Sequence, residues 1–342
     1  MKISTQLMYA GNPKELIEHV VALENAGLDT VWVAEAYGFD SPTLMGYIAA
    51  KTSRVQIGSA ILPIYSRTPA LIAQTAAGLD AVSGGRAILG LGASGPQVIE
   101  GWHGVAYDKP LGRTREVIDI CRRIWRREVI TNTGNYNIPL PEGQGTGLGK
   151  PLKILTHPVR PEIPIYVASL GDKNVQMTAE IADGWLPTLF IPEKAQSVWG
   201  QSLAAGKQKR DPALGELEIV AGGMLAIGDD VTGLRDASRP YIALYVGGMG
   251  ARGRNFYNDL AKRYGFEAEA EKIQELYLAG KKDEAAAAVP AEFAELTNLI
   301  GPAGYVKERL QAFKEAGVTS LNVTPIGENP VALIEQIKEW LA

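Results

Sequence analysis

The chain has 342 residues, of which 46% are hydrophobic and 21% charged, and its formal net charge is −4. This composition supports a large folded core and excludes a disordered chain. No run of basic residues occurs, so neither nucleic acid nor an anionic membrane surface is expected as a partner. The single cysteine, Cys121, rules out an internal disulfide and fits a reducing compartment.

Strand-like residues follow Met1-Lys2 directly, so no signal sequence is expected, and no apolar run is long enough to cross a membrane. These features predict a cytoplasmic protein.

Short apolar segments typical of β-strands recur along the chain. They are expected at residues 2–8, 30–35, 55–62, 86–92, 163–168, 185–188, 217–227 and 318–323.

Nearly all of these strands alternate with helical segments, several of which have clear start signals. Asn12-Pro13, Thr68-Pro69 and Asn329-Pro330 each place a capping residue before a proline. Several strands are continuous hydrophobic runs, which indicates a parallel sheet covered on both sides. A chain that begins with a strand and ends with a helix fits a closed (β/α)8 TIM barrel. An open doubly wound sheet is the main alternative.

No linker divides the chain, so we expect a single domain over 1–342 with two insertions. The first, at about 135–163, begins with a hairpin around Tyr136 and continues as an irregular segment rich in glycine and proline. The second, at about 230–295, is almost wholly helical and could cover a site or form a subunit contact. Glycines interrupt it at 247–250, 265 and 280.

The third strand narrows to small residues, Gly58-Ser-Ala60, just before it ends. Two interpretations are open. The small residues could leave room for a flat ligand against the backbone, or they could only allow neighbouring elements to pack closely.

In a TIM barrel the active site lies at the carboxyl ends of the strands, which brings scattered motifs to one place. The candidates there are Gln6 and Met8, Glu35 to Tyr37, Ala60-Ile61, Gly92 to Ser94, and Ser169 to Asn174. The last of these turns into a helix N-terminus, where free N–H groups and the helix dipole favour a phosphate.

Other kinds of site have weaker support. The run from Gly90 to Gly95 lacks the spacing of a dinucleotide fingerprint. No H-x-x-x-H, cysteine pair or G-x-S-x-G elbow occurs, so no metal site is expected. Glu35 could be a general acid or base, and an ordinary carboxylate paired with an arginine is an equal alternative.

Several stretches together resemble the bacterial-luciferase-like flavin and deazaflavin oxidoreductases, nearly from end to end. The likeness is nearest to the branch that uses coenzyme F420 and includes the methylenetetrahydromethanopterin reductases. The stretches are Gly27-Leu-Asp-Thr-Val-Trp-Val-Ala-Glu-Ala-Tyr37, Ile57-Gly-Ser-Ala-Ile61, Tyr65-Ser-Arg-Thr-Pro69, Leu79-Asp-Ala-Val-Ser-Gly-Gly-Arg-Ala-Ile-Leu-Gly-Leu-Gly92, Pro164-Ile-Tyr-Val-Ala168, Ala182-Asp-Gly-Trp185 and Gly317-Val-Thr319.

The resemblance implies a bacterial-luciferase-like barrel that holds F420, with FMN as the alternative cofactor. It places a non-proline cis peptide at Ala60–Ile61, bulging against the cofactor ring, and proton-handling roles at Glu35 and Tyr37. The cofactor-binding residues that it implies are Gln6, Glu35, Ser59, Ala60, Ile61, Gly92, Ala93, Ser94, Ser169, Leu170, Gly171, Asp172, Lys173 and Asn174.

Two departures from the family pattern bear on activity. Reductase relatives carry Asp-His after the second strand, where this chain has Glu35-Ala36, and the missing histidine argues against a sugar-phosphate dehydrogenase. The loop Ala93 to Pro96 lacks the usual acidic residue.

We therefore expect an F420-dependent oxidoreductase that transfers a hydride between the deazaflavin C5 and a small organic substrate. An FMN-dependent monooxygenase and a non-catalytic flavin-binding protein are the alternatives. The resemblance also implies a homodimer.

Overall fold

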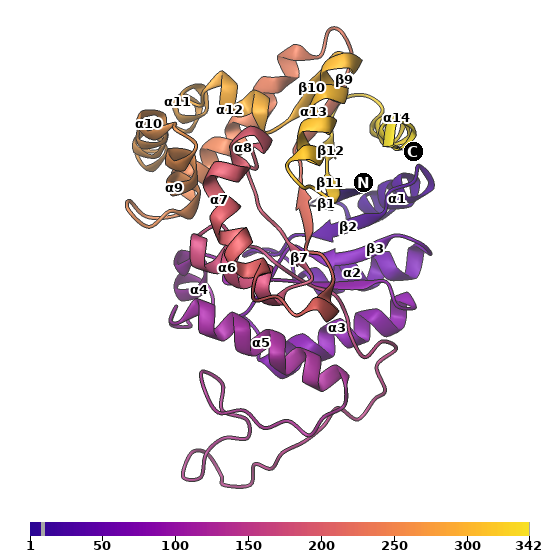
Figure 1. Cartoon of the computed structure of the whole chain (residues 1–342), viewed down its shortest axis with the longest axis vertical. Helices are drawn as coiled ribbons and strands as arrows, with labels where there is room; N and C mark the ends of the chain where they lie inside the picture. Colours follow the sequence, from indigo (N-terminus) through magenta and orange to yellow (C-terminus); the bar gives the residue numbers. More distant parts are fainter. Residues whose placement is uncertain (8–10, 342) are drawn as a thin grey trace.

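The computed structural model describes residues 1–7 and 11–341, and the candidate Met8 lies outside them. Its centre is a closed barrel of parallel strands, in the order β3-β2-β1-β11-β8-β7-β6-β5, with β3 also pairing with β5 (Figure 1). These strands are β1 (Lys2–Leu7), β2 (Thr30–Val33), β3 (Gln56–Ser59), β5 (Ala87–Gly92), β6 (Ile165–Val167), β7 (Gly184–Trp185), β8 (Glu218–Ala221) and β11 (Ser320–Asn322). The predicted TIM barrel is confirmed.

Helices surround the barrel, and the predicted start signals act as caps. Asn12 Oδ1 accepts a hydrogen bond from Lys14 N, and Thr68 Oγ1 accepts one from Leu71 N. The barrel helices are α1 (Pro13–Asn25), α2 (Ser41–Lys51), α3 (Pro69–Ser83), α4 (Pro96–Gly101), α5 (Pro110–Trp125), α6 (Asp172–Ile181), α7 (Pro192–Lys207), α13 (Ala303–Glu315) and α14 (Pro330–Leu341). A short 3₁₀ helix, η1, spans Pro212–Leu214. In the described ranges no helix has the length and apolar character needed to span a membrane.

The prediction of one strand over 217–227 is wrong, because the chain leaves the barrel at Gly222-Gly223. Here β8 ends, and β9 (Met224–Ile227) joins a small parallel sheet with β10 (Leu299–Gly301) and β12 (Thr324–Pro325). A Cβ on Gly222 would lie 2.2 Å from the carbonyl oxygen of Asn322, and one on Gly223 only 2.0 Å from that of Thr297. Only glycine permits this close crossing.

The barrel interior is filled by a small cluster apart from the main core: Trp32, Ile88, Tyr166 and Val220. The rings of Trp32 and Tyr166 lie 5.3 Å apart. A Cβ on Gly58 would come within 2.3 Å of the Trp32 ring, and one on Gly184 within 2.4 Å of the Tyr166 ring. Gly58 thus serves close packing, one of the two roles considered for this stretch.

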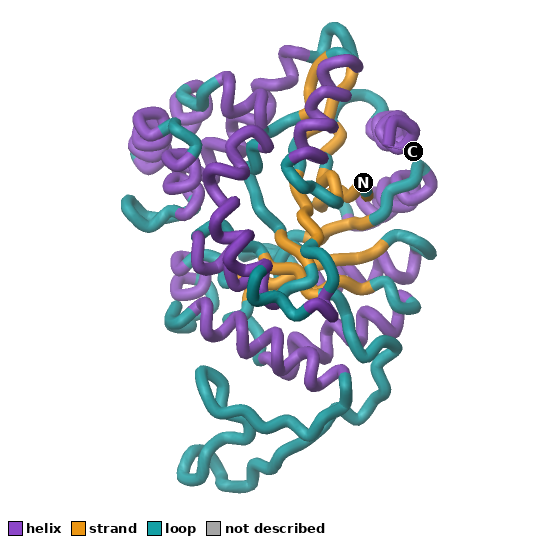
Figure 2. The backbone as a smooth tube through the Cα atoms, viewed as in Figure 1, coloured by secondary structure: helices purple, strands orange, loops and turns teal. Residues whose placement is uncertain are grey.

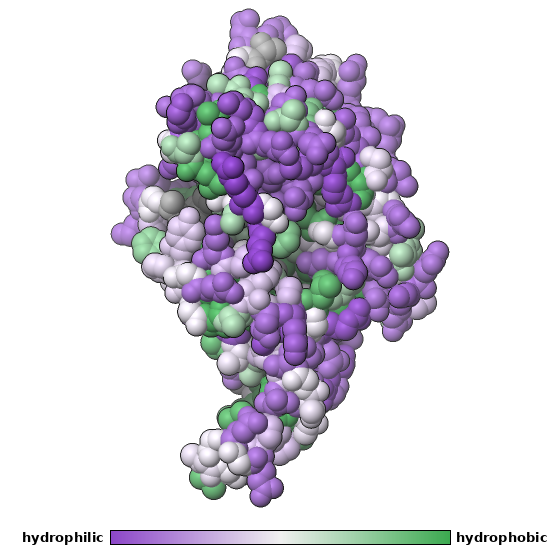
Figure 3. Space-filling view, turned by 90° about the vertical axis from the view of Figure 1, so that its left-hand side faces the viewer, coloured by the Kyte–Doolittle hydropathy of each residue, from purple (hydrophilic) through white to green (hydrophobic). Residues whose placement is uncertain are grey.

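The two predicted insertions differ in structure. Asn132 pairs with Ile138 in an antiparallel bridge, and the irregular segment 140–163 includes an arm that projects from the body (Figures 2 and 3). The second insertion consists of η2 (Thr232–Ser238), α8 (Arg239–Ala243), the π-helical turn η3 (Leu244–Gly248), α9 (Phe256–Arg263), α10 (Glu267–Leu278), α11 (Lys282–Ala287) and α12 (Ala291–Leu296).

Candidate active site

A cavity of about 1240 Å³ opens at the carboxyl ends of the barrel strands. Among the described residues, those predicted from the sequence to form the site line it, with the exception of Ser59. These residues are Gln6, Glu35, Tyr37, Ala60, Ile61, Gly92, Ala93, Ser94, Ser169, Leu170, Gly171, Asp172, Lys173 and Asn174. The structure therefore brings together residues from five strand ends that are far apart in the sequence.

The floor of the cavity includes a bulge between β3 and its continuation β4 (Leu62–Pro63). Gly58 pairs with Ile88 and Leu62 with Leu91. The segment from β3 to β4 therefore advances four residues where β5 advances three, which defines a bulge. The Ala60–Ile61 peptide bond within the bulge is cis, as the resemblance implied. Ala60 and Ile61 both line the cavity, so here the strand does offer a surface to a ligand.

Ser59 has a different role from the predicted contact with a cofactor. Its side chain is fully buried, and its Oγ donates to the Gly90 carbonyl at 2.8 Å and accepts from the Gly90 N–H at 2.9 Å. These two bonds join β3 to β5 where the bulge interrupts the ladder. A Cβ on Gly90 would lie 1.7 Å from the carbonyl oxygen of Ser59, so the join requires glycine at this position.

Glu35 is held in a paired arrangement beside the cavity. Arg67 donates from Nη1 to Oε1 at 2.5 Å and from Nη2 to Oε2 at 2.9 Å. The N–H and Oγ of Ser41 donate to Oε2 at 2.8 and 3.3 Å. Three of these four hydrogen bonds fall on Oε2 and one on Oε1, so both carboxylate oxygens have partners. Of the two interpretations left open by the sequence, the geometry favours the carboxylate paired with an arginine.

The loop after β5 approaches the bulge closely. A Cβ on Gly92 would lie 3.0 Å from the side chain of Ile61, and Ser94 has a left-handed backbone with φ of 59°. The Ser94 carbonyl accepts a hydrogen bond from the hydroxyl of Tyr107 at 3.3 Å. The small residues here keep the wall beside Ile61 thin, which leaves space for a ligand.

The turn into α6 is fixed from behind by two buried tryptophans. Trp185 Nε1 donates to the Ser169 carbonyl at 2.9 Å, and Trp199 Nε1 donates to the Leu170 carbonyl at 2.9 Å. The cap position, Gly171, supplies no side-chain hydrogen bond, so the first N–H groups of α6 are not capped.

Two polar groups at the same turn are also without partners. Asn174 Oδ1 is buried and has no hydrogen-bond partner among the described residues. The ammonium group of Lys173 forms no ion pair within the described ranges, whereas Asp172 pairs with Arg263 at 2.6 Å. An uncapped helix N-terminus next to a free lysine is suited to an anion.

An exposed aromatic pair marks the rim. Tyr37 and Trp102 are 61% and 66% exposed, and their ring centroids lie 6.4 Å apart. Tyr37 therefore lies at the entrance to the cavity rather than at its floor.

Sequence reasoning missed several residues that line the cavity. They are Trp32, Trp102, Tyr107, Tyr241, Tyr245, Met249, Phe256, Tyr257 and Asn298. The i, i+4 spacing of Tyr241 and Tyr245 in the helical insertion was a signal that they share one face. The cavity that this face would line was not visible in the sequence.

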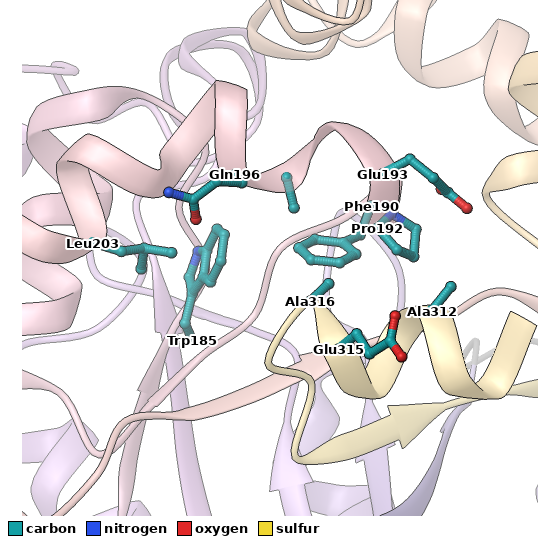
Figure 4. Close-up of a pocket in the computed structure, with 10 residues that line it drawn as sticks. Trp185, Phe190, Pro192, Glu193, Gln196, Leu203, Ala312, Glu315 and Ala316 are labelled. Carbon is teal, nitrogen blue, oxygen red and sulfur yellow. The ribbon is translucent and has the colours of Figure 1, made fainter.

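A second cavity, of about 370 Å³, lies between α7 and α13 on the outer layer of the barrel (Figure 4). Its lining residues include Trp185, Phe190, Gln196 and Glu315 and none of the predicted site residues.

The described part of the chain contains no group of three or more His, Cys, Asp and Glu side chains that could hold a metal ion.

Comparisons with known proteins agree with this architecture. The chain is 41% identical over 95% of its length to Rv3520c of Mycobacterium tuberculosis, provisionally named a coenzyme F420-dependent oxidoreductase, and covers 95% of that protein. It is 27% identical to 5,10-methylenetetrahydromethanopterin reductase of Archaeoglobus fulgidus, over 94% of this chain and 93% of the relative.

Among solved structures, the coenzyme F420-dependent tetrahydromethanopterin reductase of Methanopyrus kandleri superimposes with a TM-score of 0.80. The superposition covers 98% of this chain and 96% of the other at 22% identity, which supports the fold. The family described as luciferase-like monooxygenase matches residues 1–320. The chain therefore belongs to the luciferase-like monooxygenase family.

Proposed function

We propose that this protein is a coenzyme F420-dependent oxidoreductase. The observation that carries the proposal is the cavity at the barrel mouth, which combines the strand bulge at Ala60–Ile61 with an uncapped helix N-terminus at Gly171. The relative that is 41% identical over 95% of the chain bears the same cofactor in its name, which supports this choice.

The residues present fit such a cofactor. Ala60, Ile61 and Gly92 line one wall of the cavity and would lie against its flat ring. The start of α6 and Lys173 would hold a phosphate on its side chain. F420, when bound, supplies a hydride at the deazaflavin C5.

The protein positions the ring and the substrate relative to each other. The bulge and the loop after β5 define one face of the ring site, so an organic substrate has access only from the opposite, cavity-facing side. Arg67 and Ser41 bind the Glu35 carboxylate, so Glu35 would hold in place the segment after β2 that forms one wall of the cavity. Tyr37, at the rim, stays a candidate for handling a proton where the substrate enters.

Binding of the two candidate cofactors tests the proposal. Cofactor-free protein titrated separately with oxidised F420 and FMN should bind F420 more tightly. Lys173→Glu should weaken F420 binding by about tenfold or more, because it replaces a charge-assisted contact with repulsion. Lys150→Glu, the same charge change on the exposed arm, is the matched control. Tight FMN binding with none of F420 would favour the monooxygenase alternative.

We also propose that the protein works as a homodimer in the cytoplasm, without nucleic acid or membrane as a partner. The family resemblance supports the dimer. The composition supports the location and the absence of such partners, because the chain is acidic and its single cysteine is buried in α5. Sedimentation of the native protein tests the dimer, and cell fractionation tests the cytoplasmic location.

A further inference from the structure

Beyond the residues predicted to hold the cofactor, the cavity lining includes a cluster of aromatic side chains and one methionine. We define this part as the aromatic lining. It consists of Trp102, Tyr241, Tyr245, Met249, Phe256 and Tyr257. They lie in α8, η3 and α9 or directly after α4 and η3, outside the set that was predicted to hold the cofactor.

The tyrosines form one packed group. The ring centroids of Tyr241 and Tyr245 lie 4.5 Å apart, and those of Tyr245 and Tyr257 lie 4.7 Å apart at 89°. Burial raises the pKa of Tyr245 and of Tyr257, so both hydroxyls stay neutral at physiological pH. The group therefore offers ring faces and uncharged hydrogen-bonding groups.

A π-helical turn holds this group in place. Its widened geometry leaves carbonyls without helical partners, and Asn255 Nδ2 donates to those of Tyr245 and Val246 at 3.0 Å. Asn258 Nδ2 donates to the Val246 carbonyl at 3.1 Å as well. Both asparagines are buried, so the turn is firmly fixed.

The aromatic lining itself contains no charged side chain. Of the described lining residues, only Glu35, Asp172 and Lys173 are charged. Arg67 neutralises the first and Arg263 the second, while Lys173 lies at the turn that suits a phosphate. An anionic substrate against the aromatic lining would lose its hydration without gaining a partner of opposite charge.

We propose that the aromatic lining is the substrate subsite and that it takes uncharged, apolar, ring-containing compounds with a hydrogen-bond acceptor such as a ketone. Sugar phosphates are not its substrates. The inference rests on the proposed function, because the cofactor site would occupy the charged part of the same cavity.

Calorimetric titration of the protein, with and without saturating F420, tests the substrate class. The probes are 2-tetralone, an uncharged bicyclic ketone, and glucose 6-phosphate. With F420 saturating, so that the turn at Lys173 is occupied, we expect 2-tetralone to bind and glucose 6-phosphate to bind at least about tenfold more weakly, because only the ketone can exchange water for ring contacts. Equal or tighter binding of glucose 6-phosphate under that condition, or no binding of 2-tetralone, would overturn the proposal.

Substitutions of two residues of the aromatic lining test where 2-tetralone binds. Tyr241→Ala removes a ring and should weaken 2-tetralone binding by about fivefold, whereas Tyr241→Phe keeps the ring and should retain most of it. Trp102→Ala, at an exposed position that the fold tolerates, should weaken it too. Tyr47→Ala, on α2 and outside the cavity lining, is the matched control.

F420 binding to the same variants separates the two proposals. Tyr241→Ala and Trp102→Ala should leave F420 affinity unchanged. Wild-type protein that binds 2-tetralone and not F420 would contradict the proposed function alone. Normal 2-tetralone binding by both alanine variants would contradict the subsite alone.

Discussion

Single side chains at the barrel mouth are placed by partners from distant strands. Glu35 follows β2, and its arginine partner, Arg67, lies 32 positions further on, after the bulge. The side chains of this pair are only 6% and 14% exposed. Loss of either partner would leave the other charge buried without compensation, which is far more costly than loss of a surface pair.

At this scale we predict that Arg67→Met lowers the free energy of unfolding by about 3 kcal/mol, since it leaves the Glu35 carboxylate unpaired. Combining it with Glu35→Gln should recover part of the loss, because the remaining groups are neutral. Urea denaturation of the wild type, both single variants and the double variant measures the coupling. Additive effects would contradict a direct pair.

The same variants decide the role of Glu35 in turnover. Glu35→Gln should keep the shape of the pH–rate profile of the wild type if the carboxylate only positions the wall. Disappearance of one ionisation from that profile, in a variant that remains folded, would instead establish the proton-handling role predicted from the resemblance.

Among the secondary-structure elements, a buried carboxylate connects α1 to the segment that leads into β3. Glu24, in the last turn of α1, accepts hydrogen bonds from the N–H groups of Ser53, Arg54 and Val55. Burial by itself would raise the pKa of Glu24, but these three bonds outweigh it and lower the pKa below its usual value. The carboxylate thus fixes the start of the third strand.

A carboxyl group whose pKa is lowered in the folded state stabilises the fold above its unfolded pKa, and this contribution is lost as the pH falls through the folded pKa. We therefore predict that the unfolding free energy falls below about pH 4.5, partly through Glu24. Glu24→Gln should be less stable at pH 7 by about 1–3 kcal/mol and show a shallower acid dependence. Denaturation at several pH values measures both, and Glu18→Gln, on the exposed side of α1, is the control. An unchanged acid slope in Glu24→Gln would contradict the assignment.

On the scale of the whole molecule, the barrel is closed by segments from both ends of the chain. β1 lies between β2 and β11, and α14 lies beside α1, where Lys338 pairs with Asp29 at 2.7 Å (Figure 1). The outer surface also exposes aliphatic side chains, including Leu71 and Val82 on α3. Such a face is suited to contact with a second subunit.

We predict that the native protein sediments at close to twice the 36.7 kDa of one chain at micromolar concentration. If α3 contributes to the contact, Leu71→Glu combined with Val82→Glu should shift the species toward the monomer, because both changes bury charge at the interface. Leu148→Glu combined with Leu155→Glu, on the arm, tests an alternative contact. A monomer in the wild type at this concentration would contradict the dimer.

The order of the amino acids was enough to predict the architecture, because hydrophobic periodicity, caps and turns are local properties. The alternation of strands and helices predicted the closed barrel, and the strand-end rule gathered Gln6, Ala60 and Lys173 into one site. The resemblance added the cis bond at Ala60–Ile61, which no local pattern would have indicated.

The way in which distant segments meet became known only from the three-dimensional fold. The break at Gly222-Gly223, the fit of Gly58 against Trp32 and the pairing of Glu35 with Arg67 all depend on which atoms lie opposite a residue. Periodicity does not carry that information, since it describes a residue's own strand or helix. For the same reason, the sequence placed the tyrosines of the aromatic lining only in a helical insertion. They line the site because the chain folds back over the barrel.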